Sequence, residues 1–182
     1  LFVEELKEGR PIILDGGLAT ELEAQGAVLH PTLWSAGLLH SDPEAIIKAH
    51  LAYLEAGANC IISASYQATR KGLMTLGLSA AEADDLIMRS VDLANEARRR
   101  FLADHPGTER PVLVAASAGP YCAALHDGSE YVGAYCVTPA TLHEFHEHRL
   151  ELLDRSGADV LACETIPDYQ EAAVLCELLR TT

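Results

Sequence analysis

Short apolar runs alternate along this chain with longer segments in which apolar residues recur at helical spacing. Four runs stand out, at residues 11–14, 59–64, 111–116 and 158–163. Nearly continuous apolar runs are typical of parallel strands that are buried on both faces, and the helical segments between them are typical of crossover connections. The sequence therefore predicts an α/β protein made of four strand–helix units.

Helix start signals support this division. Ser41 precedes Glu44 by three residues, and Ser79 precedes Glu82 by the same spacing. Each pair predicts a capping box, in which the two side chains bind free backbone N–H groups of the first turn. A third helix is predicted from Thr138 to Gly157, and a fourth is predicted to start within residues 165–168.

Two architectures share this pattern: an open, doubly wound sheet and a (β/α)8 TIM barrel. No G-x-G-x-x-G fingerprint follows any of the four runs, which disfavours a dinucleotide-binding sheet. A barrel usually needs about 250 residues. Under the barrel interpretation, residues 1–182 are the N-terminal portion of a single barrel domain and supply about its first four units.

Composition limits the class of partner. The chain has 13 Lys and Arg against 27 Asp and Glu, a formal net charge of −14, and this disfavours nucleic acid, which is bound by cationic side chains. Its five cysteines form no C-x-x-C pair, which favours a reducing, cytoplasmic location. No apolar run reaches the roughly 20 residues that cross a bilayer, so no membrane partner is predicted. A small-molecule ligand fits these features best.

Polar residues follow the predicted strands at the points where the strands end. In parallel α/β folds these ends meet at one edge, which is where ligands bind. The residues that would gather there are two carboxylates, hydroxyl groups and glycines: Asp15, Gly16, Gly17, Ser65, Tyr66 and Glu164.

Glu164 follows a buried run, so its carboxylate needs a partner that offsets its desolvation. That partner is either a ligand ammonium group or a structural one, such as a distant arginine or capping amides. Asp15 is either a ligand contact or a simple turn residue. Gly16 and Gly17 would let backbone N–H groups approach a carboxylate. An amino acid carries both an ammonium and a carboxylate group.

The segment His143-Glu144-Phe145-His146-Glu147-His148 is not a zinc motif, because H-E-x-x-H would need histidine at position 147. The pairs His143 with Glu147 and Glu144 with His148 are instead predicted on a solvated helix face.

Several motifs together resemble the homocysteine S-methyltransferase family, in the family's order and over nearly the whole chain. They are residues 13–23 (Ile-Leu-Asp-Gly-Gly-Leu-Ala-Thr-Glu-Leu-Glu), 33–35 (Leu-Trp-Ser), 56–59 (Ala-Gly-Ala-Asn), 65–69 (Ser-Tyr-Gln-Ala-Thr), 128–131 (Gly-Ser-Glu-Tyr) with Gly133 and Tyr135, and 164–167 (Glu-Thr-Ile-Pro).

The resemblance implies a zinc-dependent (β/α)8 barrel that moves a methyl group from S-methylmethionine, or sometimes S-adenosylmethionine, to homocysteine and so makes methionine. The sequence after Asp15-Gly16-Gly17 is more similar to the branch that uses sulfonium donors. By resemblance, Asp15 and Glu164 would hold the homocysteine amino group. The loops with Gly16, Gly17, Ser65 and Tyr66 would line the amino-acid pocket.

The chain departs from the family at the metal. The family holds zinc with a cysteine after the sixth strand and an adjacent Cys-Cys pair, and this chain has neither. We therefore expect no metal ligand and no catalytic residue within the chain, zinc ligands in a C-terminal half, and no activity from these residues alone. The alternative is a complete but non-catalytic amino-acid-binding or half-barrel assembly module. The sequence leaves the oligomeric state open.

Overall fold

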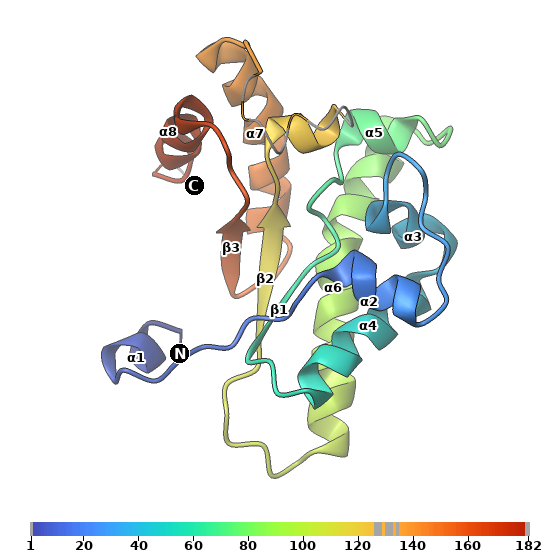
Figure 1. The fold of residues 1–182 in the computed structure, drawn as a ribbon, viewed down its shortest axis with the longest axis vertical. Coiled ribbons are helices and arrows are strands. Elements are labelled where there is room, and N and C mark those ends of the chain that lie inside the picture. Colours follow the sequence, from blue (N-terminus) through green and yellow to red (C-terminus); the bar gives the residue numbers. More distant parts are fainter. Residues whose placement is uncertain (1, 126–128, 130–132, 134, 181–182) are drawn as a thin grey trace.

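The structure is a computed structural model and describes residues 2–125, 129, 133 and 135–180 (Figure 1). Its helices and strands are, in chain order, α1 (Phe2–Lys7), α2 (Leu18–Ala24), α3 (Ser35–Ser41), α4 (Pro43–Glu55), β1 (Cys60–Ile62), α5 (Arg70–Met74), α6 (Ala80–Asp104), β2 (Leu113–Ala118), the 3-10 helix η1 (Tyr121–Ala124), α7 (Pro139–Asp154), β3 (Val160–Cys163) and α8 (Tyr169–Leu178).

The three strands form one parallel sheet in the order β1-β2-β3. This confirms the predicted α/β class with a parallel sheet. Three of the four predicted strands are present, with β2 displaced toward its carboxyl end relative to the predicted run. Because β2 extends to Ala118, Ser117 lies inside the strand and not after it.

The first predicted strand, residues 11–14, is reduced to a single parallel bridge between Leu14 and Cys60. The cause is local. The backbone N–H of Ile13 donates to the side chain of Asn59 at 3.0 Å, where a regular ladder would use a backbone carbonyl. Ile13 and Leu14 are each 56% exposed, so this segment is a weakly paired edge and not a buried strand.

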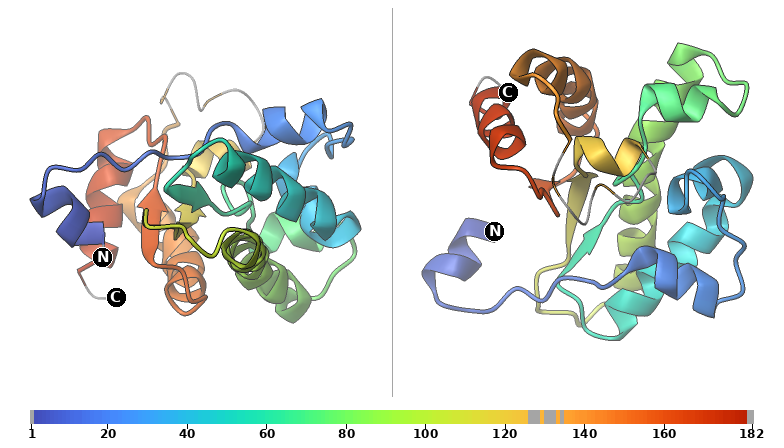
Figure 2. Two further views of the ribbon diagram at one scale, coloured as in Figure 1. Left: turned by 90° about the horizontal axis from the view of Figure 1, so that it is seen from below. Right: turned by 45° about the horizontal axis from the view of Figure 1, so that its top comes forward.

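Side chains alternate between the two faces of the sheet. Ile61, Val114 and Ala116 belong to the large core that includes the helices. Cys60, Leu113 and Ala115 form a separate, smaller cluster on the opposite face. Figure 2 shows α6 and α7 together along one side of the strands, whereas α1 stands apart from the other helices. The helices therefore cover one face, and the second face is left for other contacts.

The helix caps confirm part of the sequence prediction. Ser79 and Glu82 form the predicted capping box of α6. The box predicted at Ser41 is wrong by one residue: Asp42 is the N-cap of α4, and its carboxylate accepts from the N–H of Ala45 at 3.2 Å. Thr138 caps α7, but that helix ends at Asp154, short of Gly157.

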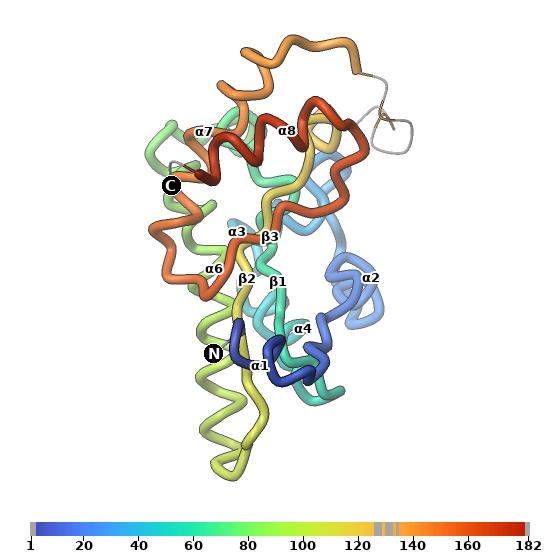
Figure 3. Tube along the Cα trace, turned by 90° about the vertical axis from the view of Figure 1, so that its left-hand side faces the viewer, coloured from blue at the N-terminus to red at the C-terminus, as the bar shows by residue number. Residues whose placement is uncertain are grey.

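The carboxyl ends of the strands define one end of the molecule. Figures 1 and 3 show α8 and the start of α7 at this end, while the C-terminal part of α6 extends past the other end. In the described part of the chain, no helix is long and apolar enough to cross a membrane.

Candidate functional site

Strand alternation places Ser117 and Glu164 on the sheet face that the helices leave free. Ser117 shares its face with Leu113 and Ala115, and its hydroxyl donates to Oε1 of Glu164 at 2.5 Å. Glu164 directly follows β3, and its backbone N–H donates to the carbonyl of Ala118 at 3.3 Å. The half-buried Glu164 carboxylate is thus oriented by β2 at the carboxyl edge of the sheet.

Asp15 lies close enough to Glu164 for the two charges to interact. Its Oδ2 accepts from the N–H of Ile62, just at the end of β1, at 2.8 Å. Its Oδ1 is buried and has no hydrogen-bond partner among the described residues. Burial, together with the negative charge of Glu164, raises the pKa of Asp15 to about 7.

No arginine, lysine or histidine of the described residues forms an ion pair with Asp15 or Glu164. The structural alternative for Glu164, a distant arginine, is therefore absent from the part of the chain that the structure describes. Two neighbouring carboxyl groups that lack a cation, one with an unpartnered buried oxygen, have the chemistry that a small cationic group would satisfy.

The Ser65 hydroxyl connects the ends of β1 and β2. It donates to the carbonyl of Ser117 at 2.8 Å and lies 2.7 Å from the hydroxyl of Ser63. The Ser63 hydroxyl in turn accepts from the N–H of Ser117 at 3.0 Å. Ser65 is fully buried, so this closed ring of hydrogen bonds fixes the strand that carries the Glu164 contact.

Gly16 and Gly17 form an exposed turn beside the Asp15 carboxylate. Tyr53 of α4 holds this turn, because its hydroxyl donates to the carbonyl of Gly17 at 3.0 Å. A Cβ added at Gly16 would lie 3.0 Å from the same hydroxyl. Sequence reasoning did not find Tyr53, whose position on the apolar stripe of α4 resembles that of any core residue.

Tyr66 is half-buried beside the turn that follows β2. A Cβ added at Gly119 would lie 2.5 Å from the carbonyl oxygen of Tyr66. The glycine is needed because the two loops approach each other here at backbone distance. Thr165, the residue after Glu164, adopts a left-handed conformation with φ of 56°, which is costly for a β-branched side chain. Such strain is typical of functional turns.

The histidine-rich segment of α7 differs from the prediction. His143 lies 3.7 Å from Glu147 on an exposed face, as predicted. His148 pairs with Asp84 at 3.1 Å, and the described residues show no ion pair between His148 and Glu144. His146, for which no pair was predicted, is fully buried and bonded to Glu171. The buried neighbour comes from α8, which periodicity within α7 cannot reveal.

The described residues do not fit a metal centre. They contain no group of three or more histidine, cysteine or acidic side chains that could hold an ion. Burial raises the pKa of the Cys60 thiol to about 11, so this cysteine stays protonated near neutral pH.

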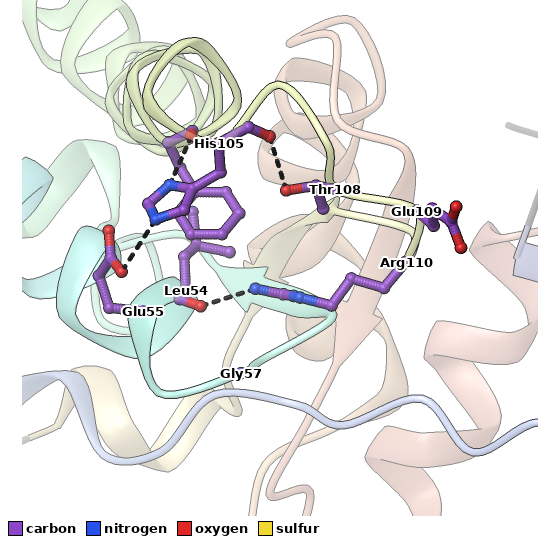
Figure 4. A pocket seen from close by; sticks show the side chains of 8 residues that line it. Leu54, Glu55, Gly57, His105, Thr108, Glu109 and Arg110 are labelled. Carbon is purple, nitrogen blue, oxygen red and sulfur yellow. Dashed lines mark hydrogen bonds and ion pairs between the residues drawn. The ribbon is translucent and has the colours of Figure 1, made fainter.

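Two cavities lie away from the carboxylate pair. The first, of about 420 Å³, lies beyond the C-terminal end of α6, and its polar groups satisfy one another (Figure 4): His105 lies 3.5 Å from Glu55, and Arg110 donates to the carbonyl of Leu54 at 2.6 Å. The second, of about 550 Å³, lies among α5, η1 and α7, and its charged lining is mainly cationic, with Arg70 and Lys71. Neither cavity has Asp15 or Glu164 in its lining.

The fold and this edge define an α/β protein with a parallel sheet whose strand ends bring the carboxyl groups of Asp15 and Glu164 near each other. Comparison with known proteins gives the particular family. Residues 12–182 match the homocysteine S-methyltransferase family, and the chain belongs to it. The 128–131 motif lies mostly outside the described residues, but the other quoted motifs fall within them.

Curated relatives agree with this assignment. The chain is 50% identical to homocysteine S-methyltransferase of Escherichia coli over 92% of its own length and 54% of the relative's. It is 51% identical to homocysteine S-methyltransferase 2 of Zea mays over 94% of its length and 52% of the relative's. It is also 48% identical to a selenocysteine Se-methyltransferase of Brassica oleracea. The chain spans about half the length of the curated relatives it matches.

A solved structure gives the same result. The metallated form of the homocysteine methyltransferase MmuM from Escherichia coli superposes with a TM-score of 0.89 at 48% identity, and the match covers 97% of this chain and 61% of that one.

Proposed function

We propose that the protein containing this chain transfers a methyl group from a sulfonium donor, S-methylmethionine or S-adenosylmethionine, to the thiol of homocysteine, giving methionine. Family membership supports the reaction class. The single structural observation that supports the acceptor is the buried, unpartnered Oδ1 of Asp15 beside Glu164. An amino acid supplies the ammonium group that these two carboxylates lack.

In this proposal Asp15 and Glu164 bind the homocysteine ammonium group from two sides. The Asp15 carboxylate already uses Oδ2 for the N–H of Ile62, so Oδ1 accepts from the ligand. The Ser117 hydroxyl holds Oε1 of Glu164 and leaves Oε2 for the ligand. Because the two carboxylates repel each other, an ammonium group between them relieves that repulsion as well as the desolvation of both.

The rest of the amino-acid pocket is proposed from the neighbouring loops. Gly16 and Gly17 are exposed and have no side chain, so a substrate carboxylate can approach their backbone closely. Ser65 and Tyr66 close the pocket beside β1. Ser65 acts there through its backbone and its fixed position, since its hydroxyl hydrogen is used on the Ser117 carbonyl.

We further propose that residues 1–182 are the N-terminal portion of one (β/α)8 barrel domain. The exposure of the strands supports this: all of β2 is buried, whereas every residue of β3 at the sheet edge is only half-buried. The described residues do not fit zinc, so the roles that we assign to them are binding and orientation only. The zinc ligands that the resemblance implies would lie outside these residues, and we expect the chain alone to be inactive.

The proposal is tested with Asp15→Asn and Glu164→Gln in the complete protein. Each change removes one charge-assisted hydrogen bond, worth about 1.5–3 kcal/mol, so homocysteine should bind roughly ten- to a hundredfold more weakly by calorimetry. Zinc content should stay that of the unmodified protein, because neither residue is proposed as a metal ligand.

Glu109→Gln is the control, since Glu109 is an exposed carboxylate near the opposite end of the strands. Unchanged homocysteine affinity in both carboxylate variants would refute the assigned roles. Homocysteine binding by the complete protein without any methyl transfer would favour the non-catalytic module instead.

A further inference from the structure

A chain of three ionisable side chains is buried behind the proposed pocket. Arg149 and His146 come from one face of α7, and Glu171 comes from the first turn of α8. Their exposed fractions are 3%, 0% and 0%. His146 Nε2 lies 2.6 Å from Oε1 of Glu171, and His146 Nδ1 lies 3.3 Å from Nη2 of Arg149. The imidazole therefore bridges a buried cation and a buried carboxyl group.

The contacts define where the protons are. The Arg149 guanidinium has only donors, so Nδ1 of His146 must accept. Nε2 then carries the ring hydrogen and donates to Glu171. Glu171 also accepts from the N–H of Tyr121 at 2.6 Å and from the hydroxyl of Tyr135. Three donors on one carboxyl group favour its ionised form, with a neutral imidazole between glutamate and arginine.

Burial and the neighbouring Arg149 lower the pKa of His146 to about 3, which agrees with a neutral ring. Burial of Arg149 lowers its pKa only to about 10, so it stays charged near neutral pH. Arg149 and Glu171 thus carry opposite charges, and the neutral ring of His146 bridges them.

The guanidinium connects this chain to the proposed pocket. Nη2 of Arg149 donates to the carbonyl of Gly119, and Nη1 lies 3.5 Å from the carbonyl oxygen of Tyr66. These carbonyls belong to the loops after β2 and β1, at the place where the two backbones approach closely. The ring of Phe145 lies under the guanidinium, 5.0 Å from its carbon, and fixes its plane.

Both loops begin with residues of the carboxylate site. Tyr66 follows Ser65, whose hydroxyl donates to the Ser117 carbonyl, and Gly119 lies two residues after Ser117, whose hydroxyl donates to Glu164. A shift of either carbonyl would therefore move the hydroxyl that orients Glu164.

We propose that Arg149, His146 and Glu171 are positioning residues that hold the loops after β1 and β2 in register, and thereby the amino-acid pocket at the ends of these strands. The inference rests on the proposed function for its ligand. The assignment of the His146 proton does not depend on that ligand.

The proposal has a consequence for pH dependence. Burial raises the pKa of Glu171 to about 7, against the opposing effect of the Tyr121 N–H. A proton on Oε1 of Glu171 must be donated, and the acceptor beside this oxygen is His146 Nε2, which moves the ring hydrogen to Nδ1, against Arg149. The other titratable groups near these three side chains are Tyr121 from η1, Tyr135, Cys163 of β3 beside Arg149, and Asp168, whose carboxylate caps α8. Protonation of Glu171 should therefore weaken the contacts of Arg149 with the carbonyls of Gly119 and Tyr66.

The direct test is Glu171→Gln in the complete protein, with homocysteine affinity measured from pH 8 to pH 6. The side chain keeps its size and one acceptor, but Arg149 loses its counter-charge. We expect about tenfold weaker binding at pH 8. We also expect a shallower loss of affinity toward pH 6, because Asp15 is then the only one of these two carboxyl groups left to titrate near pH 7.

Arg149→Lys is the second variant, since an ammonium group keeps the charge but cannot span two carbonyls. Arg100→Lys on α6, where the arginine binds Glu44 and Glu96 on the surface, is the matched control and should change neither affinity nor its pH dependence.

If Glu171→Gln does not fold, Tyr135→Phe removes one donor from Glu171 and should move the midpoint of the pH dependence upward. Affinities and pH profiles equal to those of the unmodified protein would overturn the proposal.

The tautomer is read separately by ¹⁵N NMR of the histidine rings in ligand-free protein. His146 should be neutral with its hydrogen on Nε2 at pH 8, and a ring hydrogen on Nδ1 or an imidazolium would contradict the proposed chain. If the unmodified protein does not bind homocysteine, the proposed function fails, while this measurement still decides the proton arrangement.

Discussion

Burial of the Asp15 carboxyl group has a cost in folding stability that depends on pH. The unfolded chain holds this carboxylate in water at an ordinary pKa, whereas burial and Glu164 raise its pKa to about 7 in the folded protein. The raised pKa means that the ionised group opposes folding near neutral pH, and that this cost disappears as the pH falls and the group is protonated. A bound ammonium group would remove the same cost without protonation.

Gly119 gives a test of the close approach between the two loops. In Gly119→Ala the new Cβ would lie 2.5 Å from the Tyr66 carbonyl oxygen and 2.7 Å from its ring, so the backbone must move. We expect the free energy of unfolding to fall by about 1–3 kcal/mol, as in overpacked sites, and homocysteine to bind more weakly. Urea denaturation and calorimetry measure the two effects.

Gly107→Ala is the matched control, because no atom lies within 4 Å of the position of its Cβ. If the two alanine variants had the same stability and affinity, the contact between the loops after β1 and β2 would not hold in solution.

At the scale of elements, α6 is the scaffold for β2 and α4, and its capping box is a defined source of its stability. The Ser79 hydroxyl accepts from the N–H of Glu82 at 3.3 Å, and the Glu82 carboxylate accepts from the N–H of Ser79 at 2.8 Å. Ser79→Ala should lower the free energy of unfolding by about 1 kcal/mol, measured by urea denaturation.

Ser79→Asp retains an acceptor at the N-cap and a negative charge near the helix N-terminus, so it should keep most of this stability. An alanine variant as stable as the unmodified protein would show that the box contributes nothing. Ser41→Ala is a useful comparison, since Asp42 and not Ser41 caps α4, and it should be nearly neutral.

Sequence patterns predicted those elements whose signals are local. The apolar runs predicted β1, β2 and β3, and the Ser79 box predicted α6, because periodicity and caps act within a few residues. The short helices α2, α3 and α5 were not predicted, since each has fewer than eight residues and its position depends on packing. The strand at residues 11–14 was wrong because the side chain of Asn59, distant in sequence, takes its hydrogen bond.

The same limit applies to the site. The sequence placed Asp15 and Glu164 at strand ends, and the structure brings their charges within interaction range, although their roles toward a ligand stay a prediction. The buried group of Arg149, His146 and Glu171 could not be predicted, because it depends on the packing of α7 against α8. Its only signal in the sequence was a histidine that follows the apolar side of α7.

The molecule as a whole combines buried groups whose titrations oppose one another. His50 and His146 are kept neutral, with the pKa of each lowered, whereas the pKa values of Asp15 and Glu171 are raised to about 7. As the pH falls below neutrality, the histidines favour the unfolded state, which takes up their protons first. The carboxyl groups favour the folded state over the same range. The pH dependence of stability is therefore a difference between two large contributions.

A variant of His50 can measure the histidine contribution to the pH dependence of stability. His50 is fully buried, neither ring nitrogen has a hydrogen-bond partner among the described residues, and burial alone lowers its pKa to about 4. The unfolded state binds a proton below pH 6.5 that the folded state does not, so the His50 contribution is lost as the pH falls. At pH 5 it should lower the free energy of unfolding by about 2 kcal/mol relative to pH 8.

His50→Leu removes this penalty, and urea denaturation at pH 8, 6 and 5 measures the effect. The difference in free energy of unfolding between the variant and the unmodified protein should shift by about 2 kcal/mol in favour of the variant from pH 8 to pH 5. His40→Gln, at an exposed histidine, should leave the pH dependence as it was. Equal pH dependence in the His50→Leu variant and the unmodified protein would mean that the ring is solvated or hydrogen-bonded in solution.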